Sequence, residues 1–278
     1  MKNSLLIIFF SLLSNAFCSA QSAEKIKGNR VVSIQSTDIQ SFHTIDLDED
    51  FEVEIVYGKI PYVEIETDEN LHEFIEFQVI DSILTFNKTI KITSKKRLNI
   101  KVSYDDMLRH IETSGDAEIL ALATMDLKNG SLKARESSKV GLTIKSDSFE
   151  VDADDKAKIK LNITSDTCVI NLSGNSKVDA LINTNELKAT LYQRANANIE
   201  GSCDLSFLNL DNNTEFNGKN FSANTCEVIC AISSDAYLEV RDNITIEASG
   251  TSSIYLYNNP KIVINKLTDT AKLQKKEK

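Results

Sequence analysis

The chain has 278 residues, with 31 lysines and arginines against 41 aspartates and glutamates, a formal net charge of −10 and no tryptophan. This much negative charge would repel a phosphate backbone, which argues against a nucleic-acid-binding protein. Beyond Ala20 no apolar run approaches the length that spans a membrane, so we expect no transmembrane segment in the mature chain.

Residues 1–20 have the composition of a secretory signal peptide. In chain order they contain Lys2, an apolar run over 5–13, and Cys18-Ser19-Ala20. The small residues at the end of this segment predict cleavage between Ala20 and Gln21, and therefore export to the periplasm, the cell surface or the medium. Lipidation of Cys18 is the alternative, although the bulky Phe17 lies where a lipidation site needs a small residue.

Residues 21–41 form a lead-in, and residues 42–107 are rich in predicted strands. Apolar and polar residues alternate through 51–57, 63–66 and 98–102, which is the period of a strand with one buried face. No Pro/Gly run or polar tract separates this segment from the rest of the chain. We therefore expect one continuous domain whose N-terminal strands cover or extend one end.

Two local features stand out within these strands. Asp81 and Ser82 indicate a turn between two short strands, 77–80 and 83–86. A single short helix is expected nearby. Its apolar residues are Leu71, Phe74 and Ile75, and its cap is Thr67 or Asp68.

Residues 108–257 repeat one short unit eight times, and successive units begin about 19 positions apart on average. Each unit contains a polar tripeptide with apolar residues three before it and five after its first member. The tripeptides are Ser114-Gly115-Asp116, Ser137-Ser138-Lys139, Asp154-Asp155-Lys156, Ser173-Gly174-Asn175, Tyr192-Gln193-Arg194, Asp211-Asn212-Asn213, Ser233-Ser234-Asp235 and Ser249-Gly250-Thr251. Ser, Asp, Asn and Gly favour corners, because their side chains bond nearby backbone groups or, for Gly, permit positive φ.

The apolar columns of this repeat predict the fold. Residues two apart share a face only on a strand, and a unit of this length buries its apolar face only by stacking on its neighbours. We therefore predict an all-β chain with a parallel β-helix, or β-solenoid, of about eight coils. An antiparallel sandwich is the alternative, but it does not require small and apolar positions to recur column by column.

The residues over roughly 40–255 resemble a known family. They include Phe42-x-x-Ile45, Phe51-Glu-Val-Glu-Ile55, Gly58, Val63-Glu-Ile-Glu66, Asn70-Leu71, Leu98-Asn-Ile-Lys-Val102 and Leu108-x-x-Ile111-x-x-Ser114-Gly115-Asp116. This pattern is similar to the putative auto-transporter adhesin, head GIN domain family, although its Ser-Gly corner survives here at only three places. The resemblance implies a right-handed β-helix in a secreted Bacteroidetes protein, a domain over 42–257, and no catalytic residues.

Residues 258–278 follow the last predicted coil. Asn258-Asn259-Pro260 indicates a turn, and residues 261–265 have the character of a strand. The lysine-rich tail from Lys266 is expected to be frayed.

Four cysteines remain after cleavage of the signal peptide. Cys168 and Cys230 fall in apolar columns, which indicates buried packing residues. Cys203 and Cys226 are expected to stack in adjacent coils, where an oxidising compartment would permit a disulfide.

No metal or cofactor site is predicted. His43, His72 and His110 have no zinc-ligand spacing. The acidic clusters 46–50 and 152–155 could hold calcium, but neighbouring carboxylates on a strand point to opposite faces, which favours a solvated surface.

These observations favour an exported, non-enzymatic protein whose outward faces bind a surface glycan or another protein. The alternative is a carbohydrate-active enzyme, a polysaccharide lyase or hydrolase on a β-helix scaffold. Such an enzyme needs paired carboxylates and aromatic platforms for sugars. The sequence indicates no carboxylate pair, and Arg109, Arg135, Arg194 and Arg241 fall in four different coils.

Overall fold

The computed structural model of the protein describes residues 24–277, so the expected cleavage site between Ala20 and Gln21 lies outside the described residues. The N-terminal elements are β1 (Lys25–Lys27), β2 (Val32–Asp38), β3 (Thr44–Leu47), β4 (Glu52–Tyr57), β5 (Tyr62–Asp68), the 3-10 helix η1 (Glu69–Phe74), β6 (Ile75–Ile80), β7 (Ile83–Lys88), β8 (Lys91–Ser94) and β9 (Leu98–Tyr104). The remaining elements are β10 (His110–Thr113), β11 (Glu118–Asp126), β12 (Asn129–Ala134), β13 (Lys139–Ala153), β14 (Lys158–Leu172), β15 (Lys177–Tyr192), β16 (Asn196–Asp211), β17 (Glu215–Cys230), β18 (Asp235–Ala248), β19 (Ser253–Tyr257), β20 (Lys261–Leu267) and β21 (Lys272–Lys275).

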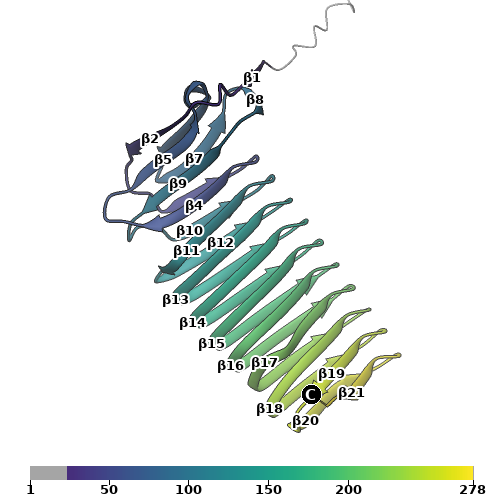
Figure 1. The fold of residues 1–278 in the computed structure, drawn as a ribbon. Coiled ribbons are helices and arrows are strands. Elements are labelled where there is room, and N and C mark those ends of the chain that lie inside the picture. Colours follow the sequence, from purple (N-terminus) through teal and green to yellow (C-terminus); the bar gives the residue numbers. More distant parts are fainter. Residues whose placement is uncertain (1–23, 278) are drawn as a thin grey trace, which may run out of the picture.

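The chain from β10 onward winds into stacked parallel coils (Figure 1). Most residues of β13 pair with the residue 19 positions later in β14, and the same offset relates β14 to β15 and β15 to β16. All pairings among these coils are parallel, whereas the antiparallel pairings lie in the N-terminal strands. The protein is therefore a β-solenoid of about nine turns, not an antiparallel sandwich.

One corner of each coil has a residue with positive φ. These residues are Glu49, Gly115, Glu136, Asp155, Gly174, Gln193, Asn212, Ile232, Gly250 and Asp269. Two predicted corners were wrong by two residues, because the turns lie at Glu136 and Ile232 and not at the Ser-Ser pairs that follow them. Glutamate and isoleucine seldom adopt positive φ, so the sequence signal favoured the neighbouring serines.

A column of small residues lies just after this corner. Its members are Ala117, Ser138, Ala157, Ser176, Ala195, Thr214, Ser234 and Ser252, all fully buried. The Ser176 hydroxyl donates to the Ser173 carbonyl oxygen at 2.7 Å, and the Ser252 hydroxyl donates to the Ser249 carbonyl oxygen at 2.9 Å. From the second coil to the ninth these positions hold only alanine, serine or threonine, whereas the first coil has the buried Phe51 opposite Ala117.

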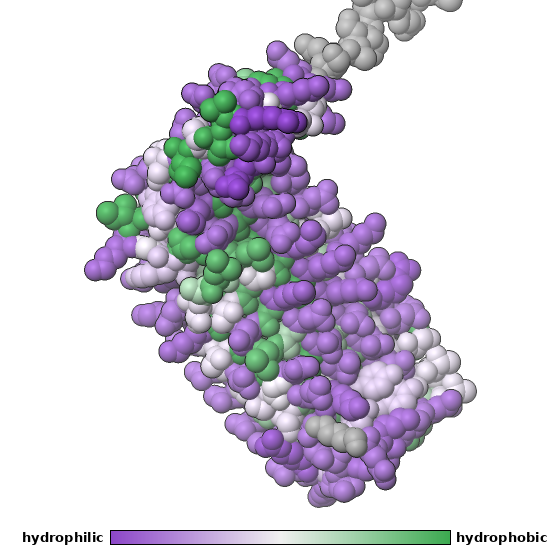
Figure 2. Space-filling view, viewed as in Figure 1, coloured by the Kyte–Doolittle hydropathy of each residue, from purple (hydrophilic) through white to green (hydrophobic). Residues whose placement is uncertain are grey.

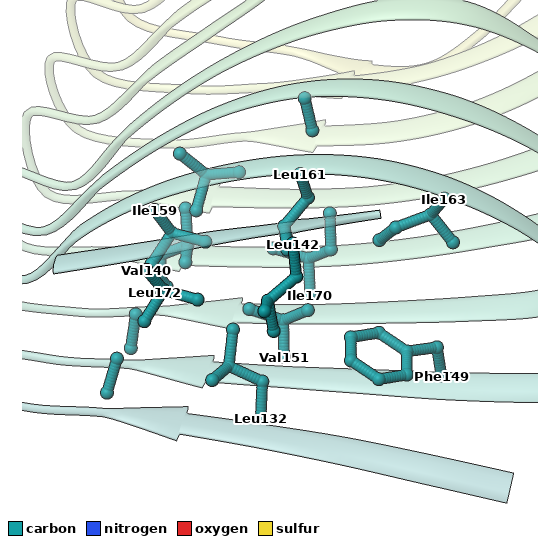
Figure 3. Close-up of a cluster of buried hydrophobic side chains, with 14 of the residues drawn as sticks. Leu132, Val140, Leu142, Phe149, Val151, Ile159, Leu161, Ile163, Ile170 and Leu172 are labelled. Atoms are coloured by element: carbon teal, nitrogen blue, oxygen red, sulfur yellow. The ribbon is translucent and has the colours of Figure 1, made fainter. Parts of the chain in front are cut away.

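The core consists of inward columns that alternate with outward residues along each strand. Figure 3 shows the side chains of neighbouring coils stacked between the two walls. Val151, Ile170 and Ala189 form one such column, and each is at most 2% exposed. Burying a side chain as large as isoleucine stabilises a fold by roughly 1.5–3 kcal/mol, so the columns supply the main stabilising term.

The first coil begins earlier than the repeat predicts. β3 and β4 pair in parallel with β10 and β11, and the turn between them contains Glu49. Residues 58–109 then leave the solenoid, and their strands β7 and β9 pair with the other edges of β3 and β4. The acidic cluster 46–50 is therefore a corner, and the N-terminal strands close one end of the stack.

The predicted turn at Asp81 and Ser82 is confirmed, since both residues have positive φ between the antiparallel strands β6 and β7. The predicted helix is a 3-10 helix that ends at Phe74, so Ile75 belongs to β6. Asp68 precedes the helix without capping it, because its carboxylate accepts the Lys96 backbone N–H at 2.8 Å.

The tail predicted to be frayed is instead a further coil. β20 pairs with β18, β21 pairs with β19, and Asp269 lies in the corner between them. The lysines obscured this coil in the sequence, although Ile262 and Ile264 continue the inward columns of Ile244 and Ile246. No helix among residues 24–277 is long and apolar enough to cross a membrane.

Candidate binding surface

The acidic clusters serve the corners of the solenoid. The Asp48 carboxylate accepts the Glu49 backbone N–H at 2.6 Å, and the Asp154 carboxylate accepts that of Asp155 at 2.7 Å. Asp155 in turn accepts the Glu136 backbone N–H of the preceding coil at 3.3 Å. These oxygens stabilise positive-φ turns, and no group of three or more potential metal ligands is found within residues 24–277.

Two groups in the first corner have perturbed protonation. Lys88 forms an ion pair with Asp50, and this hydrogen bond holds the pKa of the Asp50 carboxyl below its ordinary value. Burial, reinforced by the nearby Glu112, raises the pKa of Asp46. Lys88 also lies 4.1 Å from the centre of the Phe51 ring, so it packs against the core as well as pairing with the acids.

The structure brings two of the three histidines together. The rings of His43 and His110 lie 6.3 Å apart, edge to face. His43 and His110 form hydrogen bonds with the hydroxyls of Thr44 and Ser131, both at 2.8 Å. His72 is in the N-terminal strands, where its ring contacts the Ser33 hydroxyl at 2.9 Å.

All four described cysteines are buried, free thiols. Burial raises the pKa of each thiol to about 12. Cys203 aligns with Ala223 and Cys226 aligns with Ser206, so the two cysteines do not stack in one column as expected. The one-residue difference assumed from the corner spacing is three residues in the actual register, and a Cys203–Cys226 bridge stays a prediction.

The predicted arginines do not converge on one place. Arg109 donates to the backbone oxygens of Asp106 and Leu108, both at 2.6 Å, and Arg194 donates to the Asn175 side chain at 2.8 Å. Arg241 lies beside a groove along the second bend of the coils. Arg135 lines a different hollow on the other wall, so the four guanidinium groups lie in separate coils and do not form one site.

The stacked tyrosines Tyr237 and Tyr255 do not form a sugar platform. Their ring centroids are 4.5 Å apart with planes within 15°, as expected for side chains in register on adjacent strands. Lys276 lies 5.0 Å from the Tyr255 ring centre. Each ring therefore faces its neighbour along the solenoid axis instead of facing outward.

Each coil presents two outward walls. The first half of each long strand, after the corner, forms one wall, and the second half, before the next corner, forms the other. We call the part of the first wall made by residues 139–145, 158–164 and 177–183 the lysine wall. The equivalent part of the other wall, 148–152, 167–171 and 186–190, is the opposite wall.

Charge is unevenly divided between these walls. The outward positions of the lysine wall hold five lysines and one aspartate, whereas those of the opposite wall hold three acids and one lysine. The outward charged residues of the lysine wall are Lys139, Lys145, Lys158, Lys160, Lys177 and Asp179. This basic patch lies on a chain whose net charge is −10.

Three of these lysines stand in one column. Lys139 pairs in register with Lys158, and Lys158 with Lys177, so the column has a lysine in three consecutive strands. Lys139 has a partner, Glu118, at 3.3 Å. Within the described chain no carboxylate lies within 4.0 Å of the ammonium groups of the other two.

A hollow of about 360 Å³ adjoins this column. It exists because Gly141 has no side chain in the outward column between Leu120 and Lys160. The Leu120 side chain bends over Gly141, where an added Cβ would come within 2.6 Å of it. Figure 2 shows apolar side chains in a strip that runs from the N-terminal end toward the middle coils, bordered by hydrophilic residues.

The lysine column was not predicted, although its signal is present in the sequence. Lys139, Lys158 and Lys177 follow one another at an interval equal to the length of the repeat. The error at the second corner assigned Lys139 to a turn, which removed it from the outward column of Lys158 and Lys177. An alignment on the buried small residues Ser138, Ala157 and Ser176 would have revealed the column.

Comparisons with known proteins agree with this fold. The sequence model of one family, described as putative auto-transporter adhesin, head GIN domain, matches residues 41–181 and 160–260. No curated protein matches the sequence.

Three crystal structures illustrate the structural likeness. A putative adhesin from Parabacteroides distasonis ATCC 8503 has a TM-score of 0.67 and 15% identity, covering 90% of this chain and 100% of its own. A putative adhesin from Parabacteroides merdae ATCC 43184 has a TM-score of 0.63 and 19% identity, covering 91% and 99%. A putative lipid binding protein from Parabacteroides distasonis ATCC 8503 has a TM-score of 0.59 and 19% identity, also covering 91% and 99%.

Proposed function

This chain belongs to the putative auto-transporter adhesin, head GIN domain family, and from that membership we propose that it is an exported, non-enzymatic binding protein. One side wall of the solenoid would be the binding surface. Support comes from the family description, from solved structures described as putative adhesins, and from the signal-peptide character of residues 1–20.

The observation that carries this proposal is the regular outward ladder on a well-packed stack. Outward side chains recur at the same place in successive coils, while the inward columns beneath them stay buried. An extended partner lying across several coils would make many similar contacts, each individually weak. Such a wall suits an elongated polymer better than a small molecule enclosed on all sides.

A polysaccharide-active enzyme on the same scaffold is the competing function. The adjacent carboxylates of Asp154 and Asp155, in one of the two acidic clusters, both accept backbone hydrogen bonds at a corner. Their role in the turn accounts for their presence without catalysis. Replacing either with alanine should therefore lower the stability of the corner. The wild-type protein should have no polysaccharide-cleaving activity, so the variants should lose none.

Binding to a surface extract of the producing cells tests the proposal. The mature protein, starting at Gln21, is expected to retain a glycan or protein from the extract, and heat-denatured protein is the control. Replacing the outward residues Asn162, Leu181 and Glu200 together with alanine should weaken retention by a step, and a second triple should weaken it further. No retention at all, or loss of a polysaccharide-cleaving activity in the Asp154→Ala variant with its fold intact, would contradict the proposal.

The binding assay also includes vesicles, because one similar structure is described as a putative lipid binding protein. Retention on vesicles but not on the extract would replace the surface glycan or protein with a lipid as the partner.

A further inference from the structure

We propose that the lysine wall binds the carboxylates of an acidic polysaccharide, with successive uronate sugars lying along the column of Lys139, Lys158 and Lys177. This inference rests on the proposed function and names the class of ligand for that binding surface. It is a binding site without catalysis.

The column is costly to the free protein. Like charges directly opposite each other on adjacent strands are destabilising, and the chain has ten more acidic than basic residues with which it could have alternated the signs. At one such place it does so: Glu64 lies opposite Lys101, and their charged atoms are 3.8 Å apart. Like charges also meet in register at Glu118 and Glu52 and at Glu215 and Asp235, but those residues are acids. Three lysines in register, two of them without a carboxylate partner, are explained by an anion that supplies the missing charge.

The spacing of the column favours a sugar polymer over an extended acidic peptide. Parallel strands place successive lysines roughly 4.8 Å apart, whereas an extended acidic peptide presents same-face side chains about every 6.6–6.8 Å. The net charge of −10 disfavours every polyanion alike, so only the local patch of lysines, within about a Debye length of the ligand, can attract one. In a two-fold extended sugar chain, alternate rings turn their carboxylates to the same side, and two strand spacings, roughly 9.6 Å, separate Lys139 from Lys177. A uronate polymer along the column can therefore place carboxylates of alternate rings against these lysines.

The hollow beside the column suits the other part of such a ligand. Leu120 and the bare backbone of Gly141 give it an apolar part. Its charged lining consists of four lysines and two acids: Lys139, Lys158, Lys160, Lys177, Glu118 and Asp179. A sugar ring has an apolar face of C–H groups and polar groups at its edge. The ring would lie against Leu120 with its carboxylate directed toward the lysines.

Neighbouring charges limit the site to about three coils. Glu118 pairs with Lys139 at one end, and Glu215 follows Asn196 in the same column at the other. Asp179 lies next to Lys160 in the adjacent column. The central pair, Lys158 and Lys177, is therefore the part of the column most available to an anion, and affinity should fall as salt screens the charges.

Affinity electrophoresis of the mature protein in gels containing polygalacturonate tests this inference. The wild-type protein is expected to be retarded at low salt and not in gels containing neutral dextran. The double variant Lys158→Gln/Lys177→Gln should bind about 5-fold or more weakly, since two exposed charge contacts each contribute roughly 0.5–1 kcal/mol. Replacing both lysines with arginine should preserve the retardation, because arginine keeps the charge and binds carboxylates well.

The matched control is Lys133→Gln/Lys188→Gln, which removes the same charge from the other wall. Both Gln double variants need the far-ultraviolet circular dichroism of the wild type. Equal loss in the two variants, or wild-type retardation no greater in polygalacturonate than in dextran, would overturn the inference.

Parallel gels with polyglutamate and sedimentation with anionic vesicles separate the other polyanions. Tighter binding to either would replace the polysaccharide with that class of partner. A protein that ignores polygalacturonate yet retains a partner from the surface extract leaves the proposed function standing. Failure in both assays removes the proposed function as well.

Discussion

Deleting the same atoms from an inward and an outward isoleucine should have very different costs. Ile170 is 0% exposed, whereas Ile229 is 47% exposed on an outward position of β17. We expect Ile170→Ala to lower the free energy of unfolding by about 3–4 kcal/mol, since Ile→Ala changes in cores cost about 2–5 kcal/mol. The cavity it leaves would open toward Ala189, which is too small to fill it.

The cost at Ile229 should be much smaller. About half of its side chain is already in water, so the lost burial is worth about 1 kcal/mol or less and no enclosed cavity forms. In thermal unfolding followed by circular dichroism, a domain of this size shifts by about 2–4 °C per kcal/mol. The predicted shifts are therefore about 6–16 °C for Ile170→Ala and at most about 2–4 °C for Ile229→Ala.

Hydrogen exchange adds spatial information, because solenoids can unfold in parts. Amides of β13, β14 and β15 should lose most protection in Ile170→Ala, with the loss declining toward both ends of the stack. Equal destabilisation by the two variants, or a loss of protection spread uniformly from β3 to β21, would refute the alternation of inward and outward columns.

Three further predictions concern protonation and processing. Burial raises the pKa of the four described thiols to about 12 from the ordinary 9.0, so their contribution to stability is present at neutral pH and is lost as pH rises above about 9. The urea midpoint should therefore fall between pH 8 and 10.5, and it should fall less steeply in Cys168→Ala. Identical slopes in the two proteins would argue against thiol burial. The Lys88–Asp50 ion pair lowers the pKa of Asp50, so its contribution to stability is present above the ordinary carboxyl pKa and is lost as pH falls through the folded value. Lys88→Gln should therefore lower the free energy of unfolding more at pH 7 than at pH 3. A variant weakened equally at both pH values would exclude this ion pair as the cause. Intact mass of the exported protein should place its first residue at Gln21, and a diacylglycerol mass on Cys18 would contradict this. Reduction of a Cys203–Cys226 bridge would add two hydrogens to the intact mass, whereas an unchanged mass would exclude the bridge.

The stacked parallel fold could be predicted because the residues of each column recur at a nearly constant spacing along the sequence. Val151, Ile170 and Ala189 share a column at the spacing of the repeat, and a strand period of two separates them from their outward neighbours. The first coil escaped detection because the N-terminal strands over 58–109 separate its corner at Glu49 from the next corner at Gly115. Periodicity alone does not show that a chain leaves a stack and returns to it.

The corners were harder, since backbone conformation there is imposed by the stack. Glu136 and Ile232 adopt positive φ because the coils above and below hold their turns in register, against their own preference. The lysine wall depended on that register, so an error of two residues at one corner hid it. Surface charge in a solenoid can be read from sequence once the buried small residues, not the polar turn residues, set the alignment.

The central claim is that one wall of the solenoid meets an extended partner across several coils. Amine acetylation of the mature protein, free and saturated with surface-glycan extract, measures this contact by mass spectrometry at each lysine. The account predicts that Lys139, Lys158 and Lys177 are protected together, while Lys133 and Lys188 on the other wall react as in the free protein. Protection of both walls alike, or of a single lysine in one coil, would contradict it.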